Sequence, residues 1–447
     1  MINFKKGFYA DIRRENRFST LISYRNGETE QCREREEDRA FIRVFDGNMW
    51  FYASSTETDE KALQALLDGL YSAAKENADI LNNETVKKFE VHKATRLIFN
   101  SRPVKDIPLK EKDTLLNSYL PVLSEFSCAK LPGGAYVDRI STFSFVSSLG
   151  ADIKYDYQTC GLRFDCSMVE GEKKFSAHWQ TGKDEFAALY GLEGIIRASF
   201  AEQAEYMRTS VPVTPGKYPV VLSPEAAGVF AHESFGHKSE ADFMLSDESM
   251  RKEWELGKAV GSPILSIVDC GSVPGCGYVP FDDEGTAAKK NYLIKDGILA
   301  GRLHSGLTAA ALGENVTGNA RAVNCTFEPI VRMTSTYIEA GNSTFAELIK
   351  PIKKGYFIKN IRHGSGMSTF TIAPSLAYEI EDGKITRPVQ ISVISGSVFE
   401  TLGLIDGLGD KCEMLSFVMG GCGKMEQMRL PVGFGGPYVR VSKMDVQ

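Results

Sequence analysis

The chain has 447 residues, of which 43% are hydrophobic and 25% charged, the profile of a soluble globular protein with more than one hydrophobic core. Its formal net charge is -6, which argues against broad, sequence-independent nucleic-acid binding, because such binding needs a basic surface. The N-terminus has scattered charges instead of an apolar signal segment, and no stretch approaches about 18 apolar residues. We therefore expect a soluble, cytoplasmic protein.

The first strand and helix signals come early in the chain. Residues 41–53 predict a hairpin around Asp46-Gly47, a dipeptide that suits a turn with positive φ. Apolar residues at helical spacing predict an amphipathic helix over residues 60–78. The mixed charges of residues 33–39 are typical of a solvated face.

The pattern then changes to period two. Residues 139–182 predict a β-meander with turns at Gly150, Gly161 and residues 170–171, and a long helix follows over residues 183–208. Three prolines and a glycine in residues 211–219 interrupt regular structure. We place a domain boundary there, between an N-terminal mixed α/β domain (1–210) and a C-terminal domain (211–447).

The second half is predicted to be mostly strand around one functional helix. Ser223-Pro224-Glu225 is a strong helix start, because serine caps, proline fits the first turn and glutamate favours the N-terminal end. Asp-Gly pairs predict hairpins over residues 292–300 and 377–385. The expected fold class is therefore α+β, with a β-rich C-terminal domain that carries the helix of a metal-binding motif.

That motif is His232-Glu233-Ser234-Phe235-Gly236-His237. Two imidazoles can hold a metal ion with a position left for water, and an adjacent carboxylate can take the proton of that water. The histidines are five residues apart, which rotates them by about 140° on an ideal α-helix. They converge only on a distorted helix, so we predict a π-bulge or break, eased by Gly236.

A third ligand is needed, and the residues leave several candidates. Cys422 is favoured, because the glycines on both sides of it let backbone N–H groups approach a thiolate. Cys412 lacks that setting, and the cysteine pairs 160/166 and 270/276 are spaced too widely for a zinc knuckle. The carboxylates that remain possible ligands are Glu240, Asp242, Asp282, Asp283 and Glu284.

Five segments of the second half resemble the TldD branch of the TldD/PmbA family, zinc metallopeptidases once described as modulators of DNA gyrase. They are HESFGHKSEADF (232–243), FDDEG (281–285), NYLIKDGILAG (291–301), TGNARA (317–322) and GCGKMEQMRLPVGFGGPYVRV (421–441). The first half is similar to the family only in general pattern and length.

The resemblance implies a role for each motif residue. His232, His237 and Cys422 would bind one Zn²⁺ per active subunit, and Glu233 would be the general base. It also implies cleavage of peptides and small or unfolded proteins, by a homodimer or by a heterodimer with a metal-free paralogue that encloses the site in a chamber.

Two further features have weaker support from the residues. Donors that could stabilise an oxyanion are His304, Arg321, His363 and Tyr438. Residues 367–372 could offer an edge strand to an extended substrate.

Two other functions stay open from the sequence. One is a peptidase of the dipeptidyl peptidase III kind, with a glutamate as third ligand. The other is a non-enzymatic partner or regulatory protein with a structural metal, although a structural site needs no base such as Glu233.

Overall fold

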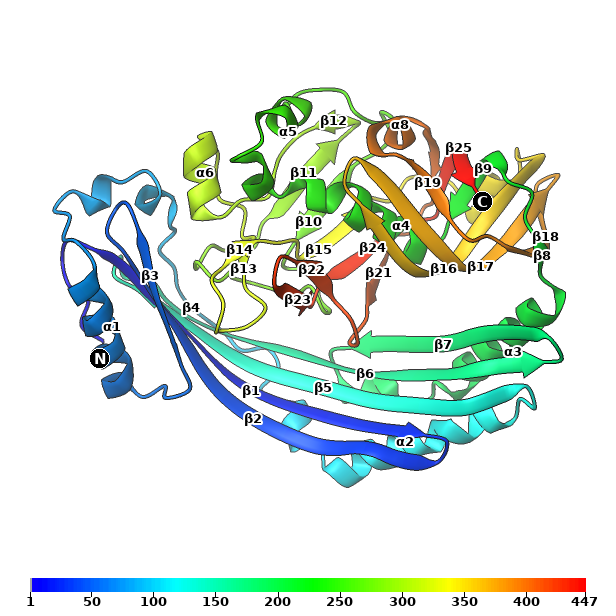
Figure 1. The fold of residues 1–447 in the computed structure, drawn as a ribbon, viewed down its shortest axis with the longest axis horizontal. Coiled ribbons are helices and arrows are strands. Elements are labelled where there is room, and N and C mark those ends of the chain that lie inside the picture. The colour runs from blue at the N-terminus through cyan, green and yellow to red at the C-terminus, as the bar shows by residue number, and fades with distance from the viewer. Residues whose placement is uncertain (1) are drawn as a thin grey trace.

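The computed structural model describes residues 2–447 and shows a long curved sheet that faces a second, β-rich half of the chain (Figure 1). The long sheet has the order β3-β2-β1-β5-β6-β4, with β7 paired to β6. Its strands are β1 (Tyr9–Arg25), β2 (Glu28–Phe45), β3 (Trp50–Ser55), β4 (Lys93–Arg96), β5 (Ala129–Ser147), β6 (Asp152–Glu170) and β7 (Lys173–Lys183).

Three helices bury apolar side chains against this sheet. They are α1 (Glu60–Ala73), α2 (Leu109–Ser124) and α3 (Glu193–Thr209). Helix α1 packs Leu63 and Leu67 against β2, while α2 and α3 share a core with β5, β6 and β7 that includes Phe164 and Phe200. In Figure 1 helix α2 lies below the sheet, so the upper face of the sheet is left for the second half of the chain.

The second half holds two larger sheets. The first has the order β12-β11-β10-β15-β24-β21. Its strands are β10 (Ile267–Cys270), β11 (Lys290–Lys295), β12 (Ile298–Leu299), β15 (Ser335–Ile338), β21 (Glu413–Ser416) and β24 (Gly433–Gly436).

The second sheet has the order β16-β9-β25-β19-β17-β18-β8, with β20 paired to β25. Because β16 also pairs with β17, the pairings from β16 through β9, β25 and β19 to β17 form a closed ring. The strands are β8 (Val211–Pro212), β9 (Gly216–Leu222), β16 (Lys354–Gly366), β17 (Thr369–Glu381), β18 (Lys384–Gln390), β19 (Ile394–Ser397), β20 (Ile405–Leu408) and β25 (Val439–Val446).

Short elements complete this half. Two small ribbons pair β13 (Ala320–Arg321) with β14 (Ile330–Val331), and β22 (Cys422–Lys424) with β23 (Gln427–Leu430). The helices are α4 (Pro224–Phe230), α5 (Glu248–Glu253), α6 (Gly306–Leu312), α7 (Phe345–Ile349) and α8 (Val398–Gly403).

Helix α4 lies between the two larger sheets of this half and contacts strands of both. It begins as the sequence predicts: Ser223 is the N-cap, its side chain accepts a hydrogen bond from the Ala226 N–H at 3.1 Å, and Pro224 is the first helical residue. Ala227 and Phe230 are fully buried in the core shared with both sheets. The helix is thus fixed in a closely packed interior, which gives the residues that follow it a defined position.

The α+β fold class is confirmed, and so are the three Asp-Gly hairpins. Asp296 and Asp382, each followed by glycine, have φ near +50°, as the predicted turns require. The helix predicted over residues 60–78 exists but ends at Ala73, and the charged run 33–39 is largely exposed on β2. The division at about residue 211 stays a prediction.

Two details of the predicted meander and helix are wrong. Gly161 is not a turn but lies inside β6, where a side chain would collide with the Thr181 carbonyl of β7 and with Val418. The helix predicted from residue 183 begins only at Glu193, because β7 continues to Lys183. The long β1–β2 hairpin was not predicted, although Asn26-Gly27 at its tip has the positive φ angles of a two-residue turn.

Candidate metal centre

The helix is distorted where the histidine motif begins. Helix α4 passes directly into a π-helix over Ala231–Gly236, and a 3₁₀ turn follows over His237–Ser239. Hydrogen bonds from i to i+5 widen the helix, so residues five apart return to the same face. The rings of His232 and His237 lie 5.1 Å apart between centroids, at an interplanar angle of 81°. The predicted distortion is confirmed.

Gly236 serves this segment in a different way from the one predicted. Its φ of -57° is ordinary helical geometry, so the backbone freedom of glycine is not needed there. A Cβ atom at this position would instead collide with the sulfur of Met333, next to β14. Glycine therefore permits close packing of the π-helix against its neighbour.

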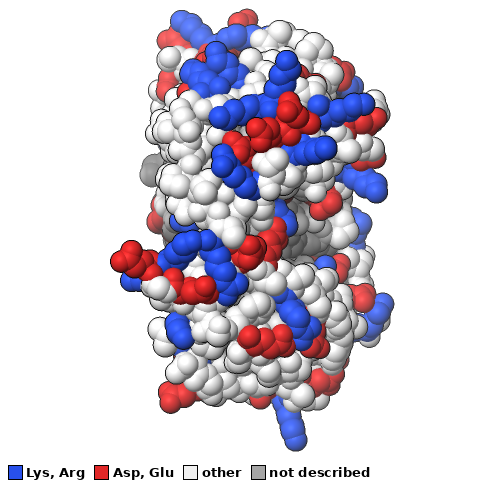
Figure 2. All heavy atoms as spheres, turned by 90° about the vertical axis from the view of Figure 1, so that its right-hand side faces the viewer, with Lys and Arg blue, Asp and Glu red and all other residues white. Residues whose placement is uncertain are grey.

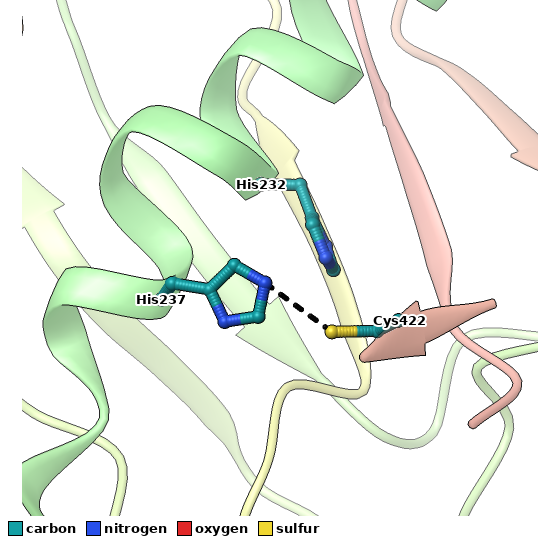
Figure 3. A group of neighbouring side chains, drawn as sticks. All are labelled: His232, His237 and Cys422. Carbon is teal, nitrogen blue, oxygen red and sulfur yellow. Dashed lines mark hydrogen bonds between the residues drawn. The ribbon is translucent and has the colours of Figure 1, made fainter. Parts of the chain in front are cut away.

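Cys422 reaches the two histidines from β22, at the other end of the C-terminal half. Its Sγ lies 3.3 Å from Nε2 of His237, and one possible ligand atom from each of the three residues lies within 4.8 Å of the others (Figure 3). Within residues 2–447 this is the one group of three or more such side chains close enough to share a metal ion.

The arrangement fits a tetrahedral ion such as zinc. Ligand atoms at about 2.0–2.3 Å from such an ion lie roughly 3.3–3.7 Å from one another. The 3.3 Å between Cys422 Sγ and His237 Nε2 lies in this range, and the other ligand atoms are within 4.8 Å. Two imidazoles and one thiolate are donors that zinc accepts in proteins. Nδ1 of His232 is also buried without a hydrogen-bond partner, so the ring is not committed to other contacts through that atom.

The electrostatics of the group favour an ionised sulfur. Burial raises the pKa of the Cys422 thiol, but the positive charges and hydrogen bonds of His232 and His237 outweigh it and lower the pKa to about 5. Burial likewise lowers the pKa of His237, while Cys422 and Glu240 raise it to about 10. A thiolate is the form of cysteine that binds metals.

A second layer of buried charges surrounds the group. Oε2 of Glu240 lies 3.3 Å from Nδ1 of His237, and Nζ of Lys424 lies 3.1 Å from the same oxygen. Lys424 also donates to Asp242 at 2.7 Å and to the Val331 carbonyl at 2.8 Å. Since Lys424 is two residues after Cys422, this ion pair links the strand with the sulfur to the segment with the histidines.

Arg332 fixes the strand of the cysteine from another side. Its fully buried guanidinium donates to the carbonyl of Cys422 at 2.8 Å and to that of Gln427 at 3.2 Å. Neither Lys424 nor Arg332 is predicted from the sequence as part of the site. The C-G-K spacing was the available signal for Lys424, because residues two apart on a strand share a face.

Glu233 is half-buried and lines a cavity of about 970 Å³ together with His232 and Cys422. The cavity lies between the two halves of the chain, because β6, β7 and α3 line it from one side, and β16 and residues 415–422 from the other. Gly364 and Gly366 of β16 leave room for Glu233, since side chains there would press on its Cγ and on its carbonyl group. The residue next to the histidines thus lines the cavity.

The predicted edge strand over residues 367–372 is wrong. Strand β17 pairs over Thr369–Ile372 with β19 on one side and over Phe370–Ile372 with β16 on the other, so both rows of backbone groups are occupied. The free edge belongs to β16 instead. Strand β9 pairs with β16 only over Tyr356–Ile358. Ser223 Oγ then donates to the Lys359 carbonyl at 2.7 Å, and Glu225 accepts from the Ile361 N–H at 2.9 Å. Among the described residues, the part of this edge without such partners is therefore 362–366, beside Glu233.

The four predicted oxyanion donors are not brought together. Only His363 lines the cavity with Glu233. His304 is buried and bonds Glu314 at 2.9 Å, while Arg321 is buried and donates to the carbonyls of Met333 and Pro431. Tyr438 packs on Phe345 at a ring distance of 4.6 Å.

The remaining ligand candidates of the sequence analysis have other contacts. Asp282 accepts hydrogen bonds from backbone N–H groups, Asp283 pairs with Arg13 at 3.1 Å, and Glu284 pairs with Arg43 at 3.0 Å. Cys412 is exposed and lies outside the group of Cys422. Cys160, Cys166, Cys270 and Cys276 are all buried and form no disulfide, as expected of structural residues.

Comparisons with known proteins agree with this geometry. The model of the PmbA/TldA metallopeptidase C-terminal domain matches residues 215–447, and that of domain 1 of the same metallopeptidases matches residues 10–76. The chain belongs to the TldD/PmbA family. This membership confirms the resemblance found in the sequence and supports a metallopeptidase.

Full-length relatives extend the TldD/PmbA match over nearly the whole chain. A metalloprotease of Methanocaldococcus jannaschii is 31% identical, over 97% of this chain and 96% of its own length. A zinc metalloprotease TldD homolog of Saccharolobus solfataricus is 27% identical, over 91% of this chain and 89% of its own. The crystal structure of TldE from Thermococcus kodakarensis shares the fold, with a TM-score of 0.78 and 16% identity over 98% of this chain and 96% of that one.

Among residues 2–447, no helix has the length and apolar character needed to cross a membrane.

Proposed function

We propose that the chain is a zinc-dependent peptidase that hydrolyses peptides or small, unfolded proteins. The observation that carries the proposal is the meeting of His232, His237 and Cys422 in one group, with Glu233 beside it on the wall of a large cavity. Such a group needs no adjacent base to hold a metal for structure alone, whereas hydrolysis does.

His232, His237 and Cys422 are the proposed ligands of one Zn²⁺. When bound, zinc would supply a water of lowered pKa and polarise the scissile carbonyl. Cys422 is favoured over Glu240 as third ligand, because Glu240 contacts Nδ1 of His237 and Lys424 and is not part of the three-residue group. Thiolate donates more charge than carboxylate, which leaves the metal a weaker Lewis acid and makes the base more important.

Glu233 is the proposed general base and acid. One of its carboxylate oxygens would take a proton from the attacking water and later deliver it to the amine nitrogen that leaves. Its place on the cavity wall next to His232 puts the carboxylate within the space that a substrate would enter.

The free edge of β16 is the proposed support for the substrate backbone. An extended peptide can add to unpaired N–H and C=O groups of a strand edge, and residues 362–366 offer such an edge beside Glu233. Because this contact uses backbone atoms, it requires an unfolded segment but little side-chain specificity.

Further parts of the proposal concern the whole particle. We propose a homodimer or a heterodimer with a metal-free paralogue, supported by the family resemblance and by the fold shared with TldE of Thermococcus kodakarensis. Light scattering of the purified chain, alone and with such a paralogue, tests this. The cytoplasmic location stays a prediction.

The decisive experiment measures metal content and peptide hydrolysis together. Glu233→Gln should keep zinc and lose hydrolysis of an unfolded peptide by roughly 10²–10⁴-fold, the usual contribution of a general base. A chelator should abolish turnover by the unaltered protein, and added zinc should restore it. Turnover that survives in Glu233→Gln would remove the catalytic role, and turnover that survives full metal removal would refute the zinc peptidase.

A further inference from the structure

The wall of the large cavity has an uneven distribution of charge. The alternation of β7 buries Phe175 and Ala177 on one side, so Lys174 and His178 face the cavity on the other. Arg163 of β6 and Arg362 of β16 line the same space. Cations from three different strands therefore surround one volume.

These cations are poorly neutralised within the chain. Among residues 2–447, no carboxylate lies within ion-pair distance of Lys174 or Arg362, and Arg163 has only Asp165 at 3.9 Å. Asp165 is itself held by Arg25 at 2.6 Å. Lys174 and Arg362 are exposed and the side chain of Arg163 is 37% exposed, so water hydrates these cations when the cavity is empty. Charges of one sign along a cleft wall create a positive potential that attracts an anionic ligand.

Two observations show that the cations act on the cavity itself. The guanidinium of Arg362 lies 6.0 Å from the ring centroid of Phe175, so this side chain extends from β16 across to β7. Burial lowers the pKa of His178, and the positive charges of Arg163 and Arg362 lower it further against the opposing effect of Asp165. The field at the wall is thus positive from both sides.

The carboxylates that also line the cavity lie elsewhere or are already occupied. Glu225 is bound by the side chain of Asn360 at 2.8 Å and by the backbone N–H of Ile361 at 2.9 Å. Glu233 is at the metal group. By contrast, the outer face in Figure 2 intersperses basic and acidic side chains, as is normal for a soluble surface.

We infer that Arg163, Lys174 and Arg362 form a subsite that binds carboxylates of the peptide substrate, and thereby favours acidic peptides. The inference rests on the proposed function in taking the cavity as the site of the substrate. The carboxylate could come from glutamate or aspartate side chains, or from the C-terminus of the peptide. Either source gives a charge-assisted contact with residues outside the group of His232, His237 and Cys422, so it selects the substrate without taking part in the reaction.

The test measures binding rather than turnover, in zinc-loaded Glu233→Gln protein titrated calorimetrically with alanine-based octapeptides. Each peptide has two Glu, two Gln or two Lys at the same positions, with a free or an amidated C-terminus. We expect the amidated Glu peptide to bind about threefold to tenfold more tightly than the amidated Gln peptide, with a smaller difference at high salt. If amidation of the Gln peptide raises its Kd, the terminal carboxylate is a further ligand of the subsite.

Variants assign the preference to the subsite. Arg362→Gln combined with Lys174→Gln should remove the difference between Glu and Gln peptides, whereas Arg362→Lys should keep most of it. Lys384→Gln, an exposed cation at the β17–β18 turn outside the cavity lining, is the matched control and should change nothing. Equal Kd values for the Glu and Gln peptides together with no effect of amidation, tighter binding of the Lys peptide, or a preference that survives in the double variant would overturn the inference. The Glu233→Gln protein used for binding is not required to hydrolyse peptide. Failure of this inference can therefore be distinguished from failure of the proposed function, which is tested by hydrolysis with the unaltered chain.

Discussion

At the scale of single residues, the ability of His232, His237 and Cys422 to hold a metal ion depends on how these side chains are charged. A buried thiol alone would stay neutral, as Cys160 and Cys276 illustrate, because burial raises the pKa of the Cys276 thiol to about 11 and that of Cys160 further. Cys422 differs because two imidazoles face it, and they lower its pKa to about 5. The same residue type is therefore a neutral thiol or a thiolate able to bind a metal, according to its neighbours.

Cys422→Ser tests this residue directly. We expect zinc affinity to fall by more than the roughly 10–100-fold that loss of an outer partner costs, because a ligand itself is removed. Atomic absorption after dialysis against a weak chelator measures the change. Cys412→Ser, an exposed cysteine ten residues earlier, is the control that should keep full zinc content. Unchanged zinc in Cys422→Ser would exclude the sulfur from the site.

At the scale of elements, the site requires one irregular helix and one fixed strand. The π-helix turns both histidines to one side, and the ion pair of Lys424 with Glu240 and Asp242 connects that segment to β22. Each device has a local cost, since π-helices and buried charges are both unfavourable in isolation. The closely packed surroundings of α4 stabilise the π-helix, and the ion pairs compensate the buried charges.

Gly236→Ala should disturb the π-helix without altering a ligand. The new methyl group collides with the Met333 sulfur, and we expect a loss of about 1–3 kcal/mol in the free energy of unfolding, with weaker zinc binding. Denaturant unfolding and zinc titration measure both effects. Adding Met333→Ala should recover part of the zinc affinity by making room. Gly69→Ala in α1, where a Cβ meets nothing, should be neutral or stabilising, and an equal loss there would contradict the explanation.

Lys424→Met should weaken the connection between β22, which carries Cys422, and the segment that carries the two histidines. It leaves Glu240 and Asp242 without their shared counter-charge in a buried setting, so we expect a loss of about 3–5 kcal/mol in the free energy of unfolding. Zinc affinity should fall by roughly 10–100-fold through the misplaced His237. Lys443→Met, at an exposed position of β25, is the matched control. Equal stability of the two variants would show that the ion pair is not needed.

At the scale of the whole molecule, the curved sheet and the β-rich half together make the cavity. Neither half encloses it alone, since β6 and β7 provide one wall and β16 with residues 415–422 provides the other. The large core around α4 is built from apolar side chains of two sheets, so we expect it to stay folded without a bound metal ion.

Metal removal should therefore weaken the fold without unfolding it. A ligand that binds only the folded state stabilises it by mass action, by about 2.7 kcal/mol at a hundredfold excess over Kd. We expect a chelator to lower Tm by a few degrees, with unchanged circular dichroism at 25 °C. Small zinc domains without a core unfold when the metal is removed, and the same behaviour here would contradict this reading of the core.

The sequence by itself determined the local features whose causes are local. Ser223-Pro224 starts α4, the Asp-Gly pairs form their turns, and the five-residue spacing of His232 and His237 requires a distorted helix. The glycines on both sides of Cys422 also indicated this cysteine as the third ligand, and the structure places it beside the two histidines.

Tertiary structure alone decided what depends on contacts between distant segments. The sequence could not place Lys424 against Glu240 and Asp242, about 180 residues away, nor show that β17 is paired on both sides while β16 has the free edge. Gly161 does not form the predicted turn for the same reason. A Cβ atom there is excluded by the Thr181 carbonyl of β7 and by the side chain of Val418, which only folding brings close. Local propensity fixes where elements begin and turn, but pairing and burial of charge are set by neighbours that only the folded chain brings together.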